Sequence, residues 1–217
     1  REKFLFEGPS GTGKTYVGMK ITKIYAMNKR KVLYIDPETG ADRDLKMFDS
    51  LDDDELSYIQ MEHATNIEAY LKWMLGWVED KSVGSQEVKI SHGTDYDLKV
   101  CDGLGTEMEL YKTKLTQRFL KQGYYEIGGT KFTIQNPDTF MLPYNFYGKL
   151  YDQIKEALVI MMDHKYDIVC TLHPIRTETS SLDGKISTAK YDLQQSIYQK
   201  FDSVIRLNKI LLPQGTP

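Results

Sequence analysis

The chain has 217 residues and a formal net charge of −3 at neutral pH, with 41% hydrophobic and 27% charged residues. This composition excludes a disordered chain, and no apolar run approaches the roughly 18 residues of a membrane span, so a soluble globular domain is expected. The 28 basic and 31 acidic residues exclude a strongly basic nucleic-acid-binding domain, so any contact with DNA must be local.

The regular apolar pattern predicts six short strands that alternate with helices, as in an α/β fold with a mostly parallel sheet and helices on both faces. The expected strands are Lys3 to Phe6, Lys31 to Asp36, Tyr58 to Met61, Leu98 to Asp102, Tyr166 to Leu172 and Ser203 to Leu207. The expected helices are Lys14 to Asn28, Ala41 to Phe48, Asn66 to Glu79, Thr106 to Gln122, Phe146 to His164 and Asp192 to Phe201.

Two stretches interrupt this rhythm. Residues 124–134 alternate polar and apolar side chains around Gly128 and Gly129, which predicts a β-hairpin inside an insertion of about residues 123–147. Residues 181–186 are a second turn candidate. The insertion holds seven aromatic residues, which could stack on single-stranded bases, but we favour packing of the hairpin as their role.

The compartment follows from the cysteines and from the start of the chain. Cys101 and Cys170 both lie in apolar runs, and no signal segment opens the sequence, which favours a reducing, cytoplasmic setting. The cysteines and the four scattered histidines predict no metal cluster. We expect a single domain over residues 1–217, trimmed from a longer chain.

A glycine-rich loop follows the first strand and opens the first helix, with the P-loop pattern G-x-x-x-x-G-K-T. Its backbone N–H groups and the helix N-terminus would hold phosphates, Lys14 would reach the β and γ phosphates, and the Thr15 hydroxyl would bind Mg²⁺. The expected nucleotide-binding residues are Gly8, Pro9, Ser10, Gly11, Thr12, Gly13, Lys14, Thr15 and Tyr16. A chance Lys-Thr after a glycine-rich turn is the alternative.

The second strand ends in Asp36, and Glu38 follows two residues later, 24 residues after Lys14. With the P-loop, this arrangement resembles the RecA superfamily of ATPases. The resemblance implies a RecA-like P-loop core in which Glu38 is catalytic and polarises the water that attacks the γ-phosphate. The alternative is a solvated loop carboxylate.

Two aspartates are candidates for the second residue, besides Thr15, that holds the magnesium ion. Asp102 ends the fourth strand, which is similar to a Walker B strand, although Lys99 departs from its apolar pattern. Asp138 follows the hairpin, where Pro137 suits a central parallel strand poorly. We therefore expect Thr15 and Asp102 to hold the metal.

The fifth strand ends in Thr171 and His173, where RecA-like ATPases place a sensor of the γ-phosphate. The resemblance implies a catalytic role for His173, and a hydrogen bond within a loop is the alternative. Arg176, Lys185 and Lys190 are weak candidates for contacts with DNA or a neighbouring subunit, and solvated surface positions explain them more simply.

The resemblance implies Mg²⁺-dependent hydrolysis of ATP by a homo-oligomer. It also implies a partner in DNA, with single strands favoured, in recombination, annealing, replication or packaging by a phage, virus or mobile element in the host cytoplasm. A nucleotide or small-molecule kinase is one alternative, since Gly8-Pro9-Ser10-Gly11 also opens the P-loops of guanylate-kinase-like enzymes. A nucleotide-dependent switch or assembly factor that hydrolyses almost nothing is another.

Overall fold

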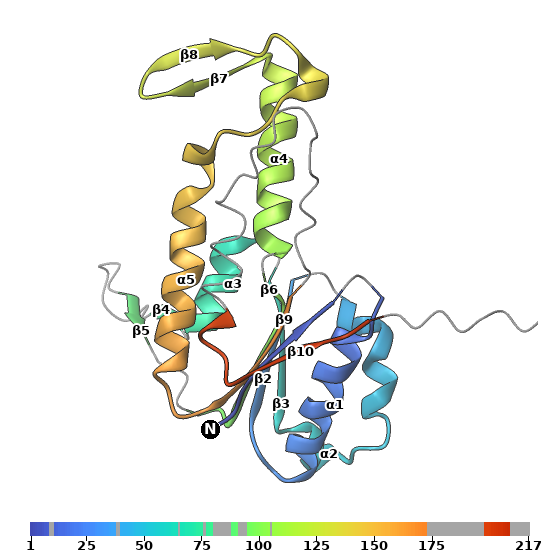
Figure 1. Cartoon of the computed structure of the whole chain (residues 1–217). Helices are drawn as coiled ribbons and strands as arrows, with labels where there is room; N and C mark the ends of the chain where they lie inside the picture. The colour runs from blue at the N-terminus through green and yellow to red at the C-terminus, as the bar shows by residue number, and fades with distance from the viewer. Residues whose placement is uncertain are drawn as a thin grey trace, which may run out of the picture.

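A six-stranded parallel sheet forms the centre of the molecule (Figure 1), with the strand order β10-β1-β9-β6-β2-β3. Its strands are β1 (Lys3–Glu7), β2 (Val32–Asp36), β3 (Ile59–His63), β6 (Leu98–Leu104), β9 (Asp167–Leu172) and β10 (Ser203–Arg206). The computed structural model describes residues 1–8, 11–37, 40–64, 66–75, 77–79, 88–90, 95–104, 106–172 and 198–208. All six expected strands are present, within two residues of the expected bounds, and the α/β prediction is confirmed.

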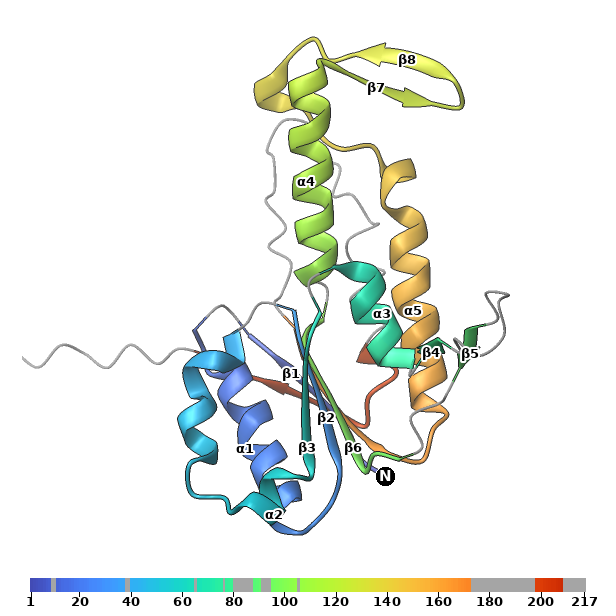
Figure 2. The ribbon, with the colours of Figure 1, turned by 180° about the vertical axis from the view of Figure 1, so that it is seen from behind.

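Helices cover both faces of the sheet (Figures 1 and 2). One face carries α1 (Lys14–Met27), the 3-10 helix η1 (Gly40–Phe48) and α2 (Asp53–Leu56), and the other carries α3 (Ile67–Leu75) and α5 (Gly148–Met162). Each face has its own apolar cluster. The cluster on the α1 face includes Met19 of α1 and Tyr34 of β2, and the cluster on the other face includes Met74 of α3 and Leu158 of α5. Among the described residues, none of the helices has the length and apolarity that crossing a membrane requires.

Two expected helices differ from the structure. Residues 41–48 form a 3-10 helix, consistent with Asp42 and Asp44, whose side chains compete for backbone hydrogen bonds. The helix expected over Asn66 to Glu79 ends at Leu75, and the unexpected strands β4 (Trp77–Glu79) and β5 (Val88–Ile90) follow as an antiparallel pair. Most of the helix expected over residues 192–201 lies outside the described residues, as does the turn at 181–186.

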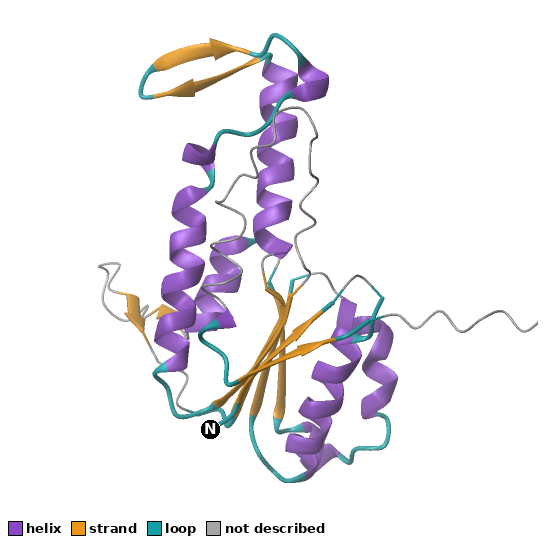
Figure 3. Ribbon diagram, viewed as in Figure 1, coloured by secondary structure: helices purple, strands orange, loops and turns teal. Residues whose placement is uncertain are grey.

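The predicted hairpin is confirmed. Strands β7 (Tyr124–Ile127) and β8 (Thr130–Thr133) pair antiparallel, and Gly128 and Gly129 have φ angles of 57° and 81°, as a two-residue turn of this kind requires. The hairpin lies at the end of α4 (Thr106–Gln122), beyond the edge of the sheet (Figure 3).

Aromatic packing holds the hairpin against the helices. The Tyr125 ring stacks on Phe132 with 5.3 Å between the ring centroids, and it also contacts Phe119, Phe140 and Phe146. A two-stranded hairpin is barely stable alone, so this cluster supplies the contacts that it needs. The packing role favoured from the sequence is confirmed for these rings.

The lysine in the middle of β6 has a structural role. Lys99 is completely buried, and its Nζ donates to the carbonyl oxygen of Met74 at 3.2 Å, at the C-terminal end of α3. Its ammonium also lies 4.8 Å from the centroid of the Tyr166 ring. The side chain therefore satisfies a carbonyl at a helix end, where positive charge is favourable.

Burial lowers the pKa of Lys99 to about 8, which makes stability depend on pH. An unfolded lysine keeps a pKa of about 10.4, so between these two pKa values the unfolded chain binds a proton that the folded chain lacks, and rising pH favours the folded state. We expect the free energy of unfolding of wild type to rise by about 2 kcal/mol relative to Lys99→Met between pH 8 and pH 10. Denaturant unfolding of both proteins across this range measures the difference. Free energies of unfolding that change equally with pH in the two proteins would contradict the prediction.

Candidate functional site

The glycine-rich loop lies between the end of β1 and the start of α1. Gly11 and Gly13 have φ angles of 74° and 86°, in the left-handed region that favours glycine. A Cβ atom at Gly8 would lie 2.3 Å from the carbonyl oxygen of Leu207, so no side chain fits there. Pro9 and Ser10 lie outside the described residues. The strand, loop and helix therefore follow one another as the P-loop motif requires.

Lys14 lies at the first position of α1, and only 4% of it is exposed. Its Nζ donates to the carbonyl oxygen of Gly8 at 2.7 Å, which holds the ammonium across the mouth of the loop. The N-terminus of the 14-residue α1 adds partial positive charge at the same place. A cation, a helix N-terminus and a glycine turn together suit a bound phosphate group.

Asp102 lies near the end of β6, and 5% of it is exposed. Its Oδ2 accepts a hydrogen bond from the Tyr34 hydroxyl at 3.0 Å, and its Oδ1 accepts from the Gly103 N–H at 3.1 Å and from the Thr171 hydroxyl. Thr15 also lies close enough to Asp102 for its hydroxyl to lower the pKa of this carboxyl. Burial raises the pKa of the Asp102 carboxyl, and the nearby hydroxyl groups of Thr171, Thr15 and Tyr34 act in the opposite direction.

Asp102 lies within a β-bulge. The register of β6 and β9 shifts between Cys101 and Leu104, and Gly103 within the shift has a φ of 63°. The Gly103 N–H also donates to Thr171 Oγ1 at 2.7 Å, so the bulge ties the ends of β6 and β9 together.

Asp138, the competing aspartate, lies in the short 3-10 helix η2 (Pro137–Thr139) and is exposed. This helix follows the hairpin, well beyond the edge of the sheet. The structure brings Asp102 and Thr15 together, and it leaves Asp138 in a different part of the molecule.

We expect Asp102→Asn to lower Mg²⁺ affinity or Mg²⁺-dependent ATP hydrolysis by about 10- to 100-fold, the usual loss for a group that holds a metal through water. The side-chain oxygen of the asparagine can still accept the hydrogen bond from the Gly103 N–H, and its NH₂ group can donate to the Tyr34 hydroxyl oxygen. The substitution therefore mainly removes charge. Phosphate release against Mg²⁺ concentration measures the effect. Asp138→Asn is the matched control, and a larger loss in that variant would reverse the assignment.

Two expected catalytic residues, Glu38 and His173, lie outside the described residues, as do Arg176, Lys185 and Lys190. Asp36, two residues before Glu38, is buried at the end of β2, and its Oδ2 accepts the N–H of Ala41 at 2.9 Å. This carboxylate therefore fixes the turn into η1.

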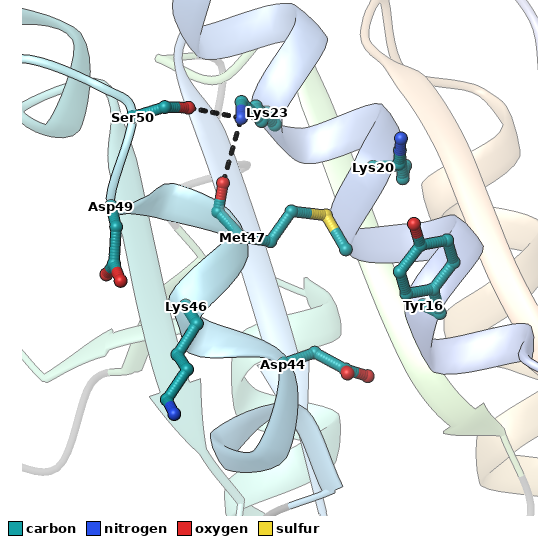
Figure 4. A pocket seen from close by; sticks show the side chains of 8 residues that line it. All are labelled: Tyr16, Lys20, Lys23, Asp44, Lys46, Met47, Asp49 and Ser50. Carbon is teal, nitrogen blue, oxygen red and sulfur yellow. Dashed lines mark hydrogen bonds between the residues drawn. The ribbon is translucent and has the colours of Figure 1, made fainter.

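A groove of about 550 Å³ lies between α1 and η1 (Figure 4). It is lined by Tyr16, Lys20, Lys23, Asp44, Lys46, Met47, Asp49 and Ser50. Tyr16 is 46% exposed in the first turn of α1, and the Lys20 ammonium lies 5.6 Å from its ring centroid. A groove of this size suits a small ligand. Tyr16 directly follows Thr15, the last residue of the P-loop motif, in the chain. The spacing of Tyr16, Lys20 and Lys23 on one helix face is the sequence signal for this groove.

The sequence did not single out two buried polar residues at this edge. The Tyr34 hydroxyl donates a hydrogen bond to Asp102. Burial raises the pKa of Tyr34 far above its usual range, and the charge of Asp102 is the next largest cause. Glu7 ends β1 with 8% exposure, and its Oε2 has no hydrogen-bond partner among the described residues, while its Oε1 lies 3.6 Å from Arg206 Nε. A charged residue directly after the apolar Phe4-Leu5-Phe6 run was the available signal.

A parallel α/β sheet with a phosphate-type loop after its first strand defines a P-loop protein. One solved structure that it resembles specifies the core. A RadB recombinase matches with a TM-score of 0.52 and 15% identity, over 98% of this chain and 76% of that chain. The chain therefore has the RecA-like P-loop fold expected from its sequence.

Two further structures match less closely. The flagellar accessory protein FlaH from Methanocaldococcus jannaschii has a TM-score of 0.43 and 12% identity, over 94% of this chain and 70% of that one. The ATPase domain of G40P has a TM-score of 0.48 and 11% identity, over 95% and 69%. No model of a known protein family and no curated protein matches the sequence.

Proposed function

We propose that this protein hydrolyses ATP with Mg²⁺. The observation that carries the proposal is the proximity of Thr15, in the first turn of α1, to the buried Asp102 carboxylate, near the end of β6. A hydroxyl and a carboxylate side by side form an oxygen donor set of the kind that Mg²⁺ prefers. They fit the metal, which when bound would neutralise charge on the β and γ phosphates.

The residues of this chain have separate tasks in the proposal. Lys14 and the loop N–H groups bind and orient the phosphates, and the groove beside Tyr16 receives the base and sugar. Glu38 orients the attacking water and takes its proton, and His173 senses the γ-phosphate. Phosphoryl transfer depends mainly on positioning and charge neutralisation, so these few groups suffice.

Steady-state phosphate release tests the proposal, with ATP and with GTP, each with and without single- and double-stranded DNA. Mg²⁺-dependent release is the expected result. Nucleotide binding without release would favour the switch or assembly factor, and release that requires a small-molecule acceptor would favour the kinase.

A partner in single-stranded DNA is the second part of the proposal. Residues 111–134 carry five basic residues and one acidic residue, in a chain with a net charge of −3. They are Lys112, Lys114, Arg118, Lys121 and Lys131, with Glu126 as the acidic one. Lys114, Arg118 and Lys121 are exposed at i, i+4 and i+7 on α4, which aligns three cations on one helix face.

Stimulation of phosphate release by single strands would support this partner. It would also support a role in recombination, annealing, replication or packaging. We further propose that the chain works in a phage, virus or mobile element, with several copies together. Equal release with and without DNA would argue against it.

A further inference from the structure

The Asp102 carboxylate is held from both neighbouring strands of the sheet. β6 lies between β9 and β2, and each of these strands supplies one hydroxyl. Thr171 on β9 donates to Oδ1, and Tyr34 on β2 donates to Oδ2 at 3.0 Å. Both donors are at most 1% exposed, so water does not compete with them.

We propose that Tyr34 is a positioning residue that fixes the Asp102 carboxylate in the orientation needed to hold Mg²⁺ with the nucleotide. This inference rests on the proposed function. Tyr34 would not touch the nucleotide itself, because its hydroxyl is bonded to the buried carboxylate. Its effect therefore passes through Asp102.

The sheet register explains why Tyr34 reaches this carboxylate. Tyr34 pairs with Val100 across β2 and β6, and Asp102 lies two residues further along β6, where its carboxylate accepts the Tyr34 hydroxyl. The length of a tyrosine side chain spans this offset, so that the hydroxyl meets the carboxylate at the edge where the loop lies.

Packing fixes the Tyr34 ring. The ring is completely buried under α1, where residue 18 is a glycine. A Cβ atom at Gly18 would lie 3.5 Å from the Tyr34 hydroxyl oxygen and 3.4 Å from a Val100 methyl group. The ring is thus packed between α1 and β6, and a donor that is buried and packed in this way can orient the carboxylate.

A second buried tyrosine provides a matched control. The Tyr70 hydroxyl, on α3 at the opposite face of the sheet, donates to the backbone oxygen of Asp102 at 3.1 Å. Tyr70→Phe therefore removes a buried hydroxyl next to the same residue and leaves the donors of the carboxylate in place. Both substitutions keep the ring and its packing, so we expect both variants to fold, which thermal unfolding checks.

The experiment compares wild type, Tyr34→Phe and Tyr70→Phe in two measurements. The first is ATP affinity by calorimetric titration, in EDTA and at a series of Mg²⁺ concentrations. The second is phosphate release against Mg²⁺ concentration. For Tyr34→Phe we expect ATP affinity in EDTA to stay within about twofold, while the Mg²⁺ concentration for half-maximal effect rises about tenfold or more, as for other partners of metal-binding groups. Tyr70→Phe should keep the wild-type Mg²⁺ dependence.

Each of the other outcomes overturns either the role of Tyr34 or the proposed function. A Tyr34→Phe protein with wild-type Mg²⁺ dependence, beside an active wild type, overturns the role of Tyr34 alone. Equal shifts in both variants overturn it as well, because they reveal a general disturbance of Asp102. A wild type that neither binds ATP more tightly with Mg²⁺ nor releases phosphate overturns the proposed function, and the role of Tyr34 falls with it.

Discussion

Lys14→Ala is expected to lose ATP hydrolysis by at least about 10²- to 10³-fold, the cost of removing one well-placed group that stabilises developing charge. Lys14 is the side-chain cation that the structure holds at the mouth of the loop, 2.7 Å from the Gly8 carbonyl oxygen. ATP affinity should fall as well, since the β and γ phosphates lose a direct partner. Phosphate release and ATP titration on the same preparation measure both effects.

Lys31→Ala is the control for the Lys14 variant. Lys31 is exposed directly before β2 begins, at the edge of the sheet opposite the loop, so its removal changes net charge equally without affecting the loop. Thermal unfolding tests whether the Lys14 variant keeps its fold after the Gly8 carbonyl loses its donor. Turnover of the Lys14 variant near that of wild type would remove the P-loop from the mechanism.

Glu38→Gln is expected to lower turnover by about 10²- to 10⁴-fold, the usual contribution of a general base, while ATP and Mg²⁺ affinities stay within a few-fold. The amide is nearly isosteric with the carboxylate but cannot take the proton of the attacking water. The loss should therefore appear in kcat, as for an interaction made mainly in the transition state. Of the two carboxylates at the end of β2 and just beyond it, Asp36 accepts the N–H of Ala41 with its Oδ2, and Glu38 is the proposed base.

This substitution also separates the ATPase from the kinase. In a kinase the base acts on an acceptor hydroxyl, so slow background hydrolysis would barely respond to Glu38→Gln. Glu126→Gln is the control, because Glu126 is exposed on β7, in the hairpin beyond the edge of the sheet. Unchanged hydrolysis would remove Glu38 from the mechanism, and lost ATP binding would make its role structural.

The local elements follow from the sequence alone. The P-loop is a strand, a glycine turn and a helix that are adjacent in the chain, so the residue order from Phe6 to Lys14 already contains the information. The turn of the β7–β8 hairpin is equally local, because a Gly-Gly pair permits the positive φ angles of a two-residue turn. The four inner strands β1, β2, β6 and β9 also follow from their apolar runs, since a strand that is buried between its neighbours and the helices has a nearly continuous apolar pattern.

The partners of the buried polar groups were decided only by the tertiary structure. Tyr34 and Thr171 lie 68 and 69 residues from Asp102 in the chain, and they meet it because the sheet order places β2 and β9 on either side of β6. Lys99 departs from the apolar pattern of its strand, and only the packing of α3 provides its partner, the Met74 carbonyl oxygen. Strand runs do not specify which strands become neighbours or which helix end covers them, and side-chain hydrogen bonds across a sheet depend on both.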